Sequence, residues 1–292
     1  MKNYKDNSSS NSDNYRSDVN IFYTVKPDIA LEKLLELTEE LNEEIKRLKP
    51  VEGDLWQTIE EKLLIEWTYN SNAIEGSSLT QGETLFFLQS GLTVEGRPLK
   101  DFIDAKNHAE AIDFLYDVVN NRREISTGLL KEFNAFLLSG IKSTPAIDSN
   151  GIKIDKKATP GEYKLLPNHV LQNDGTIHEF VLPTQVAPEM ANLCNWIKEN
   201  GNNTHPVIVG SIAHFNMVRI HPFDDGNGRG ARLLMNLILI QKGYPPAIIK
   251  NENRRKYIES LSQADKGNLN KFIEFIAESC IDTQKSVLEN LR

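Results

Sequence analysis

The chain has 292 residues, 39% hydrophobic and 25% charged, a composition ordinary for a water-soluble protein with a full hydrophobic core. Its formal net charge of −8 at pH 7 argues against nucleic acid as a partner, because binding to phosphate backbones depends on clustered lysine and arginine. Its two cysteines form no metal or disulfide pattern, and no apolar signal or membrane-length stretch occurs, so we expect a cytoplasmic protein with no membrane partner.

The N-terminal third divides into a polar tail and a helical region. Residues 1–26 contain few large apolar side chains, and we expect them to form a disordered tail. Residues 27–110 form an N-terminal helical region. Its first amphipathic pattern runs from Pro27 to Pro50, and a second begins at Asp54, a typical N-cap residue.

The second helical pattern ends in the hexapeptide SNAIEG, Ser71 to Gly76, where the glycine is a typical helix stop. Thr80 and Glu83 then have the spacing of a capping box at the start of the next helix. The hexapeptide is therefore predicted to lie at the end of one helix, just before a turn.

Residues 111–292 form the second region, which is helical apart from one stretch. Between about residues 141 and 183 the sequence turns to glycine, proline, asparagine and β-branched residues. Asn-Asp-Gly at 173–175 is a hairpin signal between predicted arms at 164–171 and 177–182. The sequence therefore predicts a mostly α-helical protein with a small β-hairpin flap.

The segment HPFDDGNGRGAR, residues 221–232, carries more reactive and anion-binding groups than any other stretch. The Gly-Asn-Gly turn at 226–228 can adopt the positive φ angles at which backbone N–H groups converge on an anion. A helix beginning near Arg229 would add its unpaired N–H groups and its positive end. Arg229 and Arg232 would project from one face of its first turn, an unfavourable arrangement unless an anion binds. The pattern predicts an oligophosphate site.

Two further residues of this segment suggest chemistry. Asp225 directly precedes the glycine-rich turn and is a suitable Mg²⁺ ligand, although Asp224 is an alternative. His221 follows a helical pattern and precedes Pro222. An imidazole titrates near neutral pH, so His221 is the candidate general base for a hydroxyl that attacks phosphorus.

The segment resembles the Fic family pattern HPFx(D/E)GNGRxxR at every specified position. The resemblance implies a mostly α Fic-type fold and transfer of AMP from ATP to a Ser, Thr or Tyr hydroxyl of a protein. It also implies a role for each matching residue: His221 as base, Asp225 as Mg²⁺ ligand, Gly226, Asn227 and Gly228 as phosphate cradle, Arg229 and Arg232 as β- and γ-phosphate contacts, and Phe223 as buried anchor. Related Doc-type kinases carry lysine at the second glycine, so Gly228 favours nucleotidyl transfer.

The resemblance extends to other segments. SNAIEG is similar to the family's inhibitory pattern (S/T)xxxE(G/N), placed before the catalytic core. It implies that Glu75 pairs with Arg232, which we expect to be bidentate, and that Ser71 caps or anchors the inhibitory helix. The hairpin resembles the family's flap, with Val170 and Leu171 nearest the nucleotide and the target held by strand addition.

A C-terminal segment, NRRKYIESLSQAD, resembles the family helix that lines the adenosine pocket. The resemblance implies contacts of Tyr257 and Asp265 with base or ribose, although tyrosine at helical spacing is also typical of a core.

These features predict a Mg²⁺-dependent protein adenylyltransferase that its own Glu75 inhibits. Three alternatives stay open: a hydrolase that removes AMP and uses Glu75 to orient water, a non-catalytic nucleotide-sensing module, and a donor other than ATP, such as UTP. The expected partner is a protein target of unknown identity, with self-modification and a homodimer as further expectations.

Overall fold

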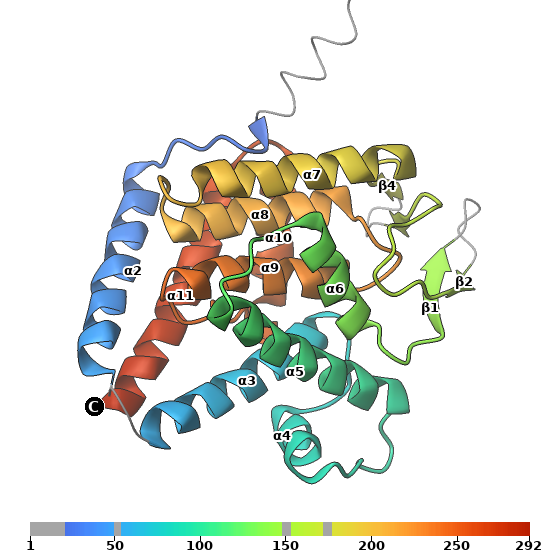
Figure 1. The fold of residues 1–292 in the computed structure, drawn as a ribbon, viewed down its shortest axis with the longest axis horizontal. Helices are drawn as coiled ribbons and strands as arrows, with labels where there is room; N and C mark the ends of the chain where they lie inside the picture. Colours follow the sequence, from blue (N-terminus) through green and yellow to red (C-terminus); the bar gives the residue numbers. More distant parts are fainter. Residues whose placement is uncertain (1–20, 50–53, 148–152, 172–176) are drawn as a thin grey trace, which may run out of the picture.

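The computed structural model describes residues 21–49, 54–147, 153–171 and 177–292, and it is mostly α-helical, as predicted (Figure 1). The helices are α2 (Ile29–Leu48), α3 (Asp54–Ile74), α4 (Gln81–Ser90), α5 (Leu99–Asn120), α6 (Thr127–Leu137), α7 (Pro183–Asn200), α8 (Pro206–Ile220), α9 (Asn227–Gln241), α10 (Arg254–Asp265) and α11 (Leu269–Leu291), with a 3-10 turn η1 (Asn251–Asn253) before α10. Within these ranges, no helix has the length and apolar character that crossing a membrane requires.

Side chains that cap the first turn mark where helices α2 and α4 begin. α2 begins after Asp28, whose carboxylate accepts a hydrogen bond from the backbone N–H of Leu31 at 3.0 Å. The predicted capping box is confirmed at α4: Thr80 Oγ1 accepts from the Glu83 N–H, and Glu83 Oε2 accepts from the Thr80 N–H. α3 ends at Ile74, so the segment SNAIEG, residues 71–76, lies at the end of this helix as expected; we call it the inhibitory-type segment.

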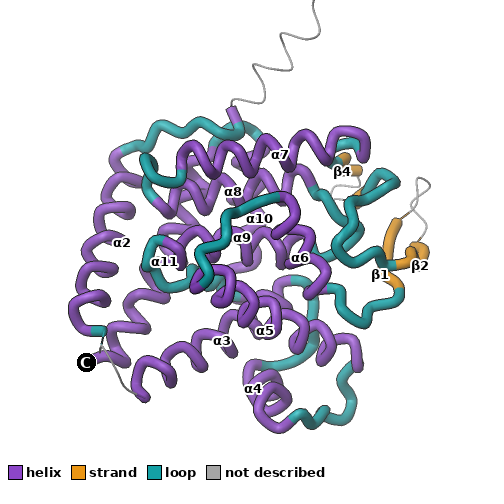
Figure 2. The backbone as a smooth tube through the Cα atoms, in the orientation of Figure 1, coloured by secondary structure: helices purple, strands orange, loops and turns teal. Residues whose placement is uncertain are grey.

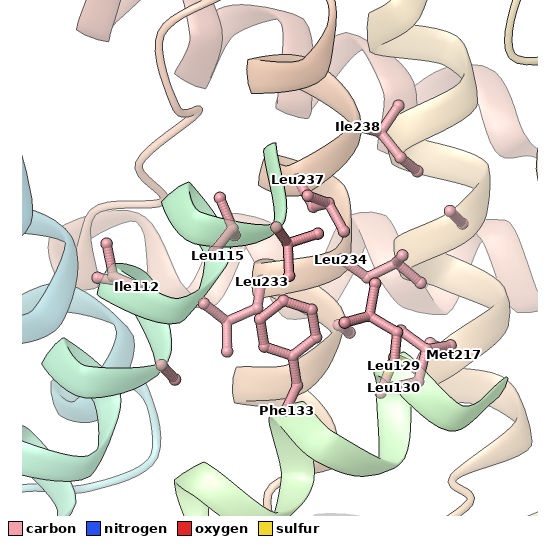
Figure 3. Close-up of a cluster of buried hydrophobic side chains, with 14 of the residues drawn as sticks. Ile112, Leu115, Leu129, Leu130, Phe133, Met217, Leu233, Leu234, Leu237 and Ile238 are labelled. Carbon is pink, nitrogen blue, oxygen red and sulfur yellow. The ribbon is translucent and has the colours of Figure 1, made fainter. Parts of the chain in front are cut away.

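Helix α9 runs through the middle of the molecule, with α7 and α8 on one side and α5 and α3 on the other (Figure 1). Residues 229–239 of this helix are all buried, which is typical of a helix surrounded by others. The larger core cluster packs α9 against α5, α6 and α8 (Figure 3), with a central group of Ile112, Leu115, Leu129, Leu130, Phe133, Met217, Leu233, Leu234, Leu237 and Ile238. The reactive segment therefore lies at one end of a helix that is almost entirely buried.

The N-terminal helices share this core. The boundary placed at residues 110 and 111 falls inside the single helix α5, and α3 packs against α5 while α2 packs against α11. Ile59, Leu63 and Trp67 of α3 belong to the same buried cluster as the residues of α9. The inhibitory-type segment is consequently held against the reactive one by continuous packing.

The end of the predicted tail is ordered against the core. Residues 1–20 lie outside the described residues, but Phe22 packs on Phe215 at 5.8 Å between ring centroids and Tyr23 packs on Trp196 at 5.6 Å. Asn216 also donates to the Phe22 carbonyl at 2.8 Å. The prediction of disorder up to residue 26 was wrong for these residues, because two aromatic rings there find apolar partners.

Two antiparallel hairpins lie at one edge of the helices (Figure 2). The predicted flap is β3 (His169–Leu171) with β4 (Ile177–Glu179), in which Val170 faces His178, and its strands are shorter than the predicted arms. Its Asn-Asp-Gly turn lies outside the described residues. The other hairpin, β1 (Ser143–Ile147) with β2 (Lys153–Lys157), was not predicted.

Candidate active site

His221 stands at the junction between α8 and the loop that leads to α9. It is the C-cap of α8, with φ 50° and ψ 60°, and its N–H donates to the Met217 carbonyl at 3.0 Å. This left-handed conformation is unusual for a residue with a Cβ and must be held by its surroundings. The imidazole stacks on Phe180, which follows β4, at 3.8 Å between centroids and an interplanar angle of 18°. The candidate base is thus fixed at a helix end, against the flap.

The loop after His221 is held by its own side chains. Asn227 accepts from the Phe223 N–H at 2.9 Å and donates to the Phe223 carbonyl at 2.8 Å. Phe223 is 1% exposed, which confirms it as a buried anchor. The side chain of Asn227 is therefore committed to the loop, and the part of this residue in the predicted phosphate cradle stays a prediction. Only its backbone N–H can contribute to an anion site.

The start of α9 has the shape of an anion site. Gly226 is the N-cap with φ 78°, a conformation that favours glycine. A side chain at Gly228 would collide with Glu75 Oε1 and lie 3.3 Å from Arg232 Nη1. The bare face of Gly228 therefore opens onto a space that the Glu75 carboxylate already occupies. An anionic group does bind at this helix start, but it belongs to the chain itself.

Arg232 is 2% exposed and held by the end of α3. Its Nε donates to Ser71 Oγ at 2.9 Å, and its Nη2 donates to the Ser71 carbonyl at 2.9 Å and to Glu75 Oε1 at 2.8 Å. The expected contact between Glu75 and Arg232 is present, but it uses one guanidinium nitrogen and is not bidentate. Ser71 binds Arg232 directly, whereas a capping or anchoring role in its own helix had been expected.

The Glu75 carboxylate is ionised in this position. Desolvation would raise its pKa, but the ion pair and hydrogen bond with Arg232, together with the charges of Arg229 and His221, lower the pKa below its ordinary value. Its side chain is nevertheless 45% exposed, against 3% for that of Arg232. The partly exposed carboxylate of Glu75 therefore covers the buried guanidinium of Arg232.

Arg229 is held by acidic residues of the frame. Its Nη1 pairs with Asp104 Oδ1 of α5 at 2.9 Å, and its Nη2 lies 3.7 Å from Asp225 Oδ1. Burial would lower the pKa of Arg229, but Asp104, Asp225 and Glu75 outweigh it and raise the pKa. The side chain is 4% exposed. Arg229 thus remains a cation with a carboxylate partner.

The two neighbouring aspartates have different surroundings. Asp224 is 5% exposed at its side chain and pairs with Lys156 of β2 at 2.5 Å, while Thr159 donates to its other oxygen at 3.2 Å. Asp225 is 31% exposed, and its Oδ1 accepts from the Gly226 N–H at 2.6 Å. Of the two predicted alternatives for a metal ligand, Asp225 is the more accessible and Asp224 is committed to the β1–β2 hairpin.

The segment before β3 is joined to the reactive loop by backbone carbonyls. The Lys164 N–H donates to the Pro222 carbonyl at 2.9 Å, and Asn168 Nδ2 donates to the Phe223 carbonyl at 2.8 Å. These bonds put the flap beside His221, where it was predicted. The predicted nucleotide contacts Val170 and Leu171 lie in β3, and their role stays a prediction.

The two residues predicted to contact base or ribose both belong to α10. Tyr257 is 2% exposed, its hydroxyl lies 3.0 Å from His214 Nε2, and its ring packs against Phe272 and Phe275. The ring belongs to the smaller core cluster while the hydroxyl interacts with Arg232 of the site, and the contact with base or ribose stays a prediction. Asp265 is exposed at the last residue of α10, and its role stays a prediction.

Two histidines that the sequence did not assign to the site flank the arginines. His108 and His214 are fully buried, and their pKa values lie well below the ordinary value because of desolvation and the charge of Arg232, to which Arg229 adds for His108. Both are therefore neutral at physiological pH. They interact with the guanidinium groups of Arg229 and Arg232 but add no charge to the site.

Sequence reasoning missed several positioning residues. Asp104 lies four residues before His108 on the buried stripe of α5, and a carboxylate at such a position is the signal that could have revealed it. Asn134 donates to the Asp225 carbonyl at 2.9 Å and accepts from the Gly161 N–H at 3.0 Å, and nothing local distinguishes it in sequence. The same holds for Phe180.

Comparison with known proteins gives consistent matches. Residues 124–239 match the Fic/DOC family. The chain is 30% identical over 217 residues to protein adenylyltransferase fic-1 of Caenorhabditis briggsae, covering 73% of this chain and 39% of that protein. Identity is also 30% over 217 residues to protein adenylyltransferase Fic of Drosophila virilis, covering 72% and 40%.

Among solved structures, the chain is similar to a Fic domain containing signaling protein from Bacteroides thetaiotaomicron. The TM-score is 0.76 and the identity 28%, covering 87% of this chain and 96% of that one. The chain thus spans about two-fifths of the length of the two animal relatives, but nearly all of the bacterial structure.

Proposed function

Because the chain belongs to the Fic/DOC family, we propose that it is a protein adenylyltransferase, which transfers AMP from ATP to a serine, threonine or tyrosine hydroxyl of a protein. The observation that carries this proposal is the first turn of α9. There, Arg229 Nε is buried without a hydrogen-bond partner among the described residues, and the same holds for Arg232 Nη1, although the Tyr257 hydroxyl interacts with the Arg232 guanidinium. Unpaired buried donors are unfavourable, and an oligophosphate at the helix start would satisfy them.

The geometry supports a direct transfer. His221 accepts the proton of the target hydroxyl, whose oxygen forms a bond to the α-phosphorus of ATP. The bond between the α-phosphorus and the bridging oxygen breaks, and its electron pair leaves with pyrophosphate. Arg229 and Arg232 hold the β- and γ-phosphates and stabilise the charge that develops on them.

Asp225 is suited to hold Mg²⁺ with the nucleotide. It is partly exposed, and Mg²⁺ in proteins commonly takes one or two carboxylates together with substrate phosphates. No group of three or more His, Cys, Asp or Glu residues able to bind a metal occurs within the described ranges, so the phosphates and water would supply the other ligands. A bound Mg²⁺ would neutralise phosphate charge.

We further propose that Glu75 inhibits the transfer. Its carboxylate lies against the bare face of Gly228 and takes one N–H of Arg232, so a γ-phosphate and Glu75 compete for the same guanidinium. The negative charges of the γ-phosphate and of the Glu75 carboxylate would repel each other beside Arg232. ATP therefore binds weakly or in a displaced pose while Glu75 is in place.

Transfer of label from ATP labelled at the α-phosphate tests both proposals. Wild type, Glu75→Gly and Glu75→Gly/His221→Ala would be incubated with ATP, Mg²⁺ and a host lysate. We expect strong labelling only with the Glu75→Gly variant, because losing a general base costs on the order of 10²- to 10⁴-fold. No label with Glu75→Gly would contradict the proposed activity. A panel of other nucleoside triphosphates in the same assay tests the donor.

A second candidate function is hydrolytic removal of AMP from a modified protein. It is favoured by the state of Glu75, which is ionised and nearly half exposed, so it could orient a water molecule towards a phosphodiester. Release of free AMP from a modified target by wild type, but not by Glu75→Gln, would support it.

The protein target would bind along the flap. β3 pairs with β4 on one side, and an extended target segment could pair with the flap by strand addition beside His221. Self-modification, a homodimer and a cytoplasmic location remain our predictions. Mass spectrometry of the labelled chain and sedimentation of the purified protein test the first two.

A further inference from the structure

Lys164, in the segment between β2 and β3, is almost completely buried. Its exposed fraction is 1%, and no carboxylate lies within ion-pair distance of its ammonium among the described residues. Desolvation lowers its pKa to about 8, with the charge of Asp224 opposing and that of Lys156 reinforcing the shift. Burying an ammonium without a direct anionic partner is unfavourable, so packing alone would be better served by an apolar side chain.

The contacts of Lys164 surround one residue. Its backbone N–H donates to the Pro222 carbonyl at 2.9 Å, and its Nζ donates to the Ile220 carbonyl at 3.4 Å. These two carbonyls belong to the residues directly before and after His221. His221 itself has the left-handed backbone conformation that its surroundings must hold.

The ammonium also contacts the ring on which the imidazole rests. Lys164 Nζ lies 5.7 Å from the centroid of Phe180, and Phe180 stacks on His221 at 3.8 Å. A cation within about 6 Å of an aromatic centroid is attracted to that ring. One side chain therefore restrains both the backbone of His221 and the partner of its imidazole.

We infer that Lys164 is a positioning residue for His221: its ammonium holds the Ile220 carbonyl and the Phe180 ring, and so keeps the imidazole oriented at the start of α9. This inference rests on the proposed function, in which His221 is the general base. Lys164 itself touches neither the nucleotide nor the target in this account.

The test compares a variant that removes the charge of Lys164 with one that keeps it. Lys164→Met and Lys164→Arg would be made in the Glu75→Gly background. The matched control is Lys131→Met, because Lys131 also lies over an aromatic ring, Tyr163 at 4.6 Å, and contacts the same segment through Glu162 at 3.1 Å. The rate of transfer, the KM for ATP and the urea midpoint of unfolding would be measured for each.

For Lys164→Met we expect kcat to fall by roughly ten- to a hundredfold, because a small misplacement of a reacting group has an effect of this size. The KM for ATP should stay within about twofold, and the unfolding midpoint should be equal or higher. Lys164→Arg should recover much of kcat, and Lys131→Met should behave like its parent. An unchanged kcat for Lys164→Met would overturn the inference, and so would a variant that fails to fold, since Lys164 would then be a structural residue.

A measurement without turnover separates this inference from the proposed function. The ring signals of His221 in an NMR spectrum, identified by their loss in His221→Ala, should shift and broaden in Lys164→Met but not in Lys131→Met. If the Glu75→Gly parent transfers nothing, the proposed function fails while these signals still decide the role of Lys164. Unchanged His221 signals in Lys164→Met would contradict it.

Discussion

The first turn of α9 presents two arginines whose surroundings differ in kind. Arg229 pairs with Asp104, which lies inside α5 and has a side chain only 10% exposed. Arg232 is held by Ser71 in the last turn of α3 and by Glu75, which follows the end of that helix and is nearly half exposed. Gly76, with φ 98°, comes directly after Glu75.

The partner of Arg229 is fixed in the core, whereas one partner of Arg232, Glu75, can be displaced. We call these two parts of the site the fixed side and the displaceable side. Asp104 could leave Arg229 only if α5 moved, and α5 is built into the central core. Glu75 could leave Arg232 by rotating its own side chain into solvent, while Ser71 kept the guanidinium in place. The same helix start can therefore be pre-organised on the Arg229 side and switchable on the Arg232 side.

The largest expected effect is a loss of stability when Arg229, on the fixed side, loses its partner Asp104. Asp104→Ala should lower the free energy of unfolding by about 3–5 kcal/mol, because it leaves the charge of Arg229 buried without its closest partner. Urea unfolding measures this loss. Asp113→Ala is the control on the same helix: desolvation and the nearby Asp117 and Glu110 raise the pKa of this carboxyl, so its removal should be neutral. Equal losses in both variants would contradict the contrast.

Ser71→Ala should have an intermediate effect. It removes the acceptor for Arg232 Nε and leaves a buried donor unpaired, so we expect a loss of about 1–2 kcal/mol in the free energy of unfolding. In the Glu75→Gly background it should weaken ATP binding, because Arg232 is less well placed for the γ-phosphate. Calorimetric titration with ATP measures this. Tighter ATP binding by Ser71→Ala in this background would contradict the prediction, because Ser71 would then hinder ATP as Glu75 does.

The smallest effect is expected from pH. The pKa of Glu75 is lowered in the folded protein, so its contribution to stability is present above the unfolded pKa and is lost only as pH falls through the lower folded value. The ratio of ATP affinities between Glu75→Gly and wild type should therefore stay constant from about pH 5.5 to about pH 8. A ratio that falls towards the acid end of this range would show that Glu75 titrates there.

Periodicity and short motifs predicted the helices, the flap and the reactive segment. Thr80 with Glu83, and Gly226 with its positive φ, act through their own neighbours, so their roles can be read from a few adjacent residues. The contact of Glu75 with Arg232 spans 157 positions and was predicted only through a family resemblance.

The rest depends on contacts that no local pattern encodes. Asp104 meets Arg229 across 125 positions, and the Lys164 ammonium reaches Ile220 across 56. The burial of Tyr257 likewise depends on contacts with α8 and α11, which the spacing within α10 does not reveal. The β1–β2 hairpin was missed for a different reason: Asn150-Gly151, a typical hairpin turn pair, lies between its strands in the sequence and was overlooked.

The central claim is that Glu75 and ATP compete for Arg232, and label transfer from α-labelled ATP tests it most directly. At equal concentrations of folded protein, we expect Glu75→Gly to transfer at least about tenfold more AMP than wild type, the equivalent of roughly 1.4 kcal/mol in transition-state binding. The added His221→Ala should remove that gain. Equal transfer by wild type and Glu75→Gly would contradict the claim.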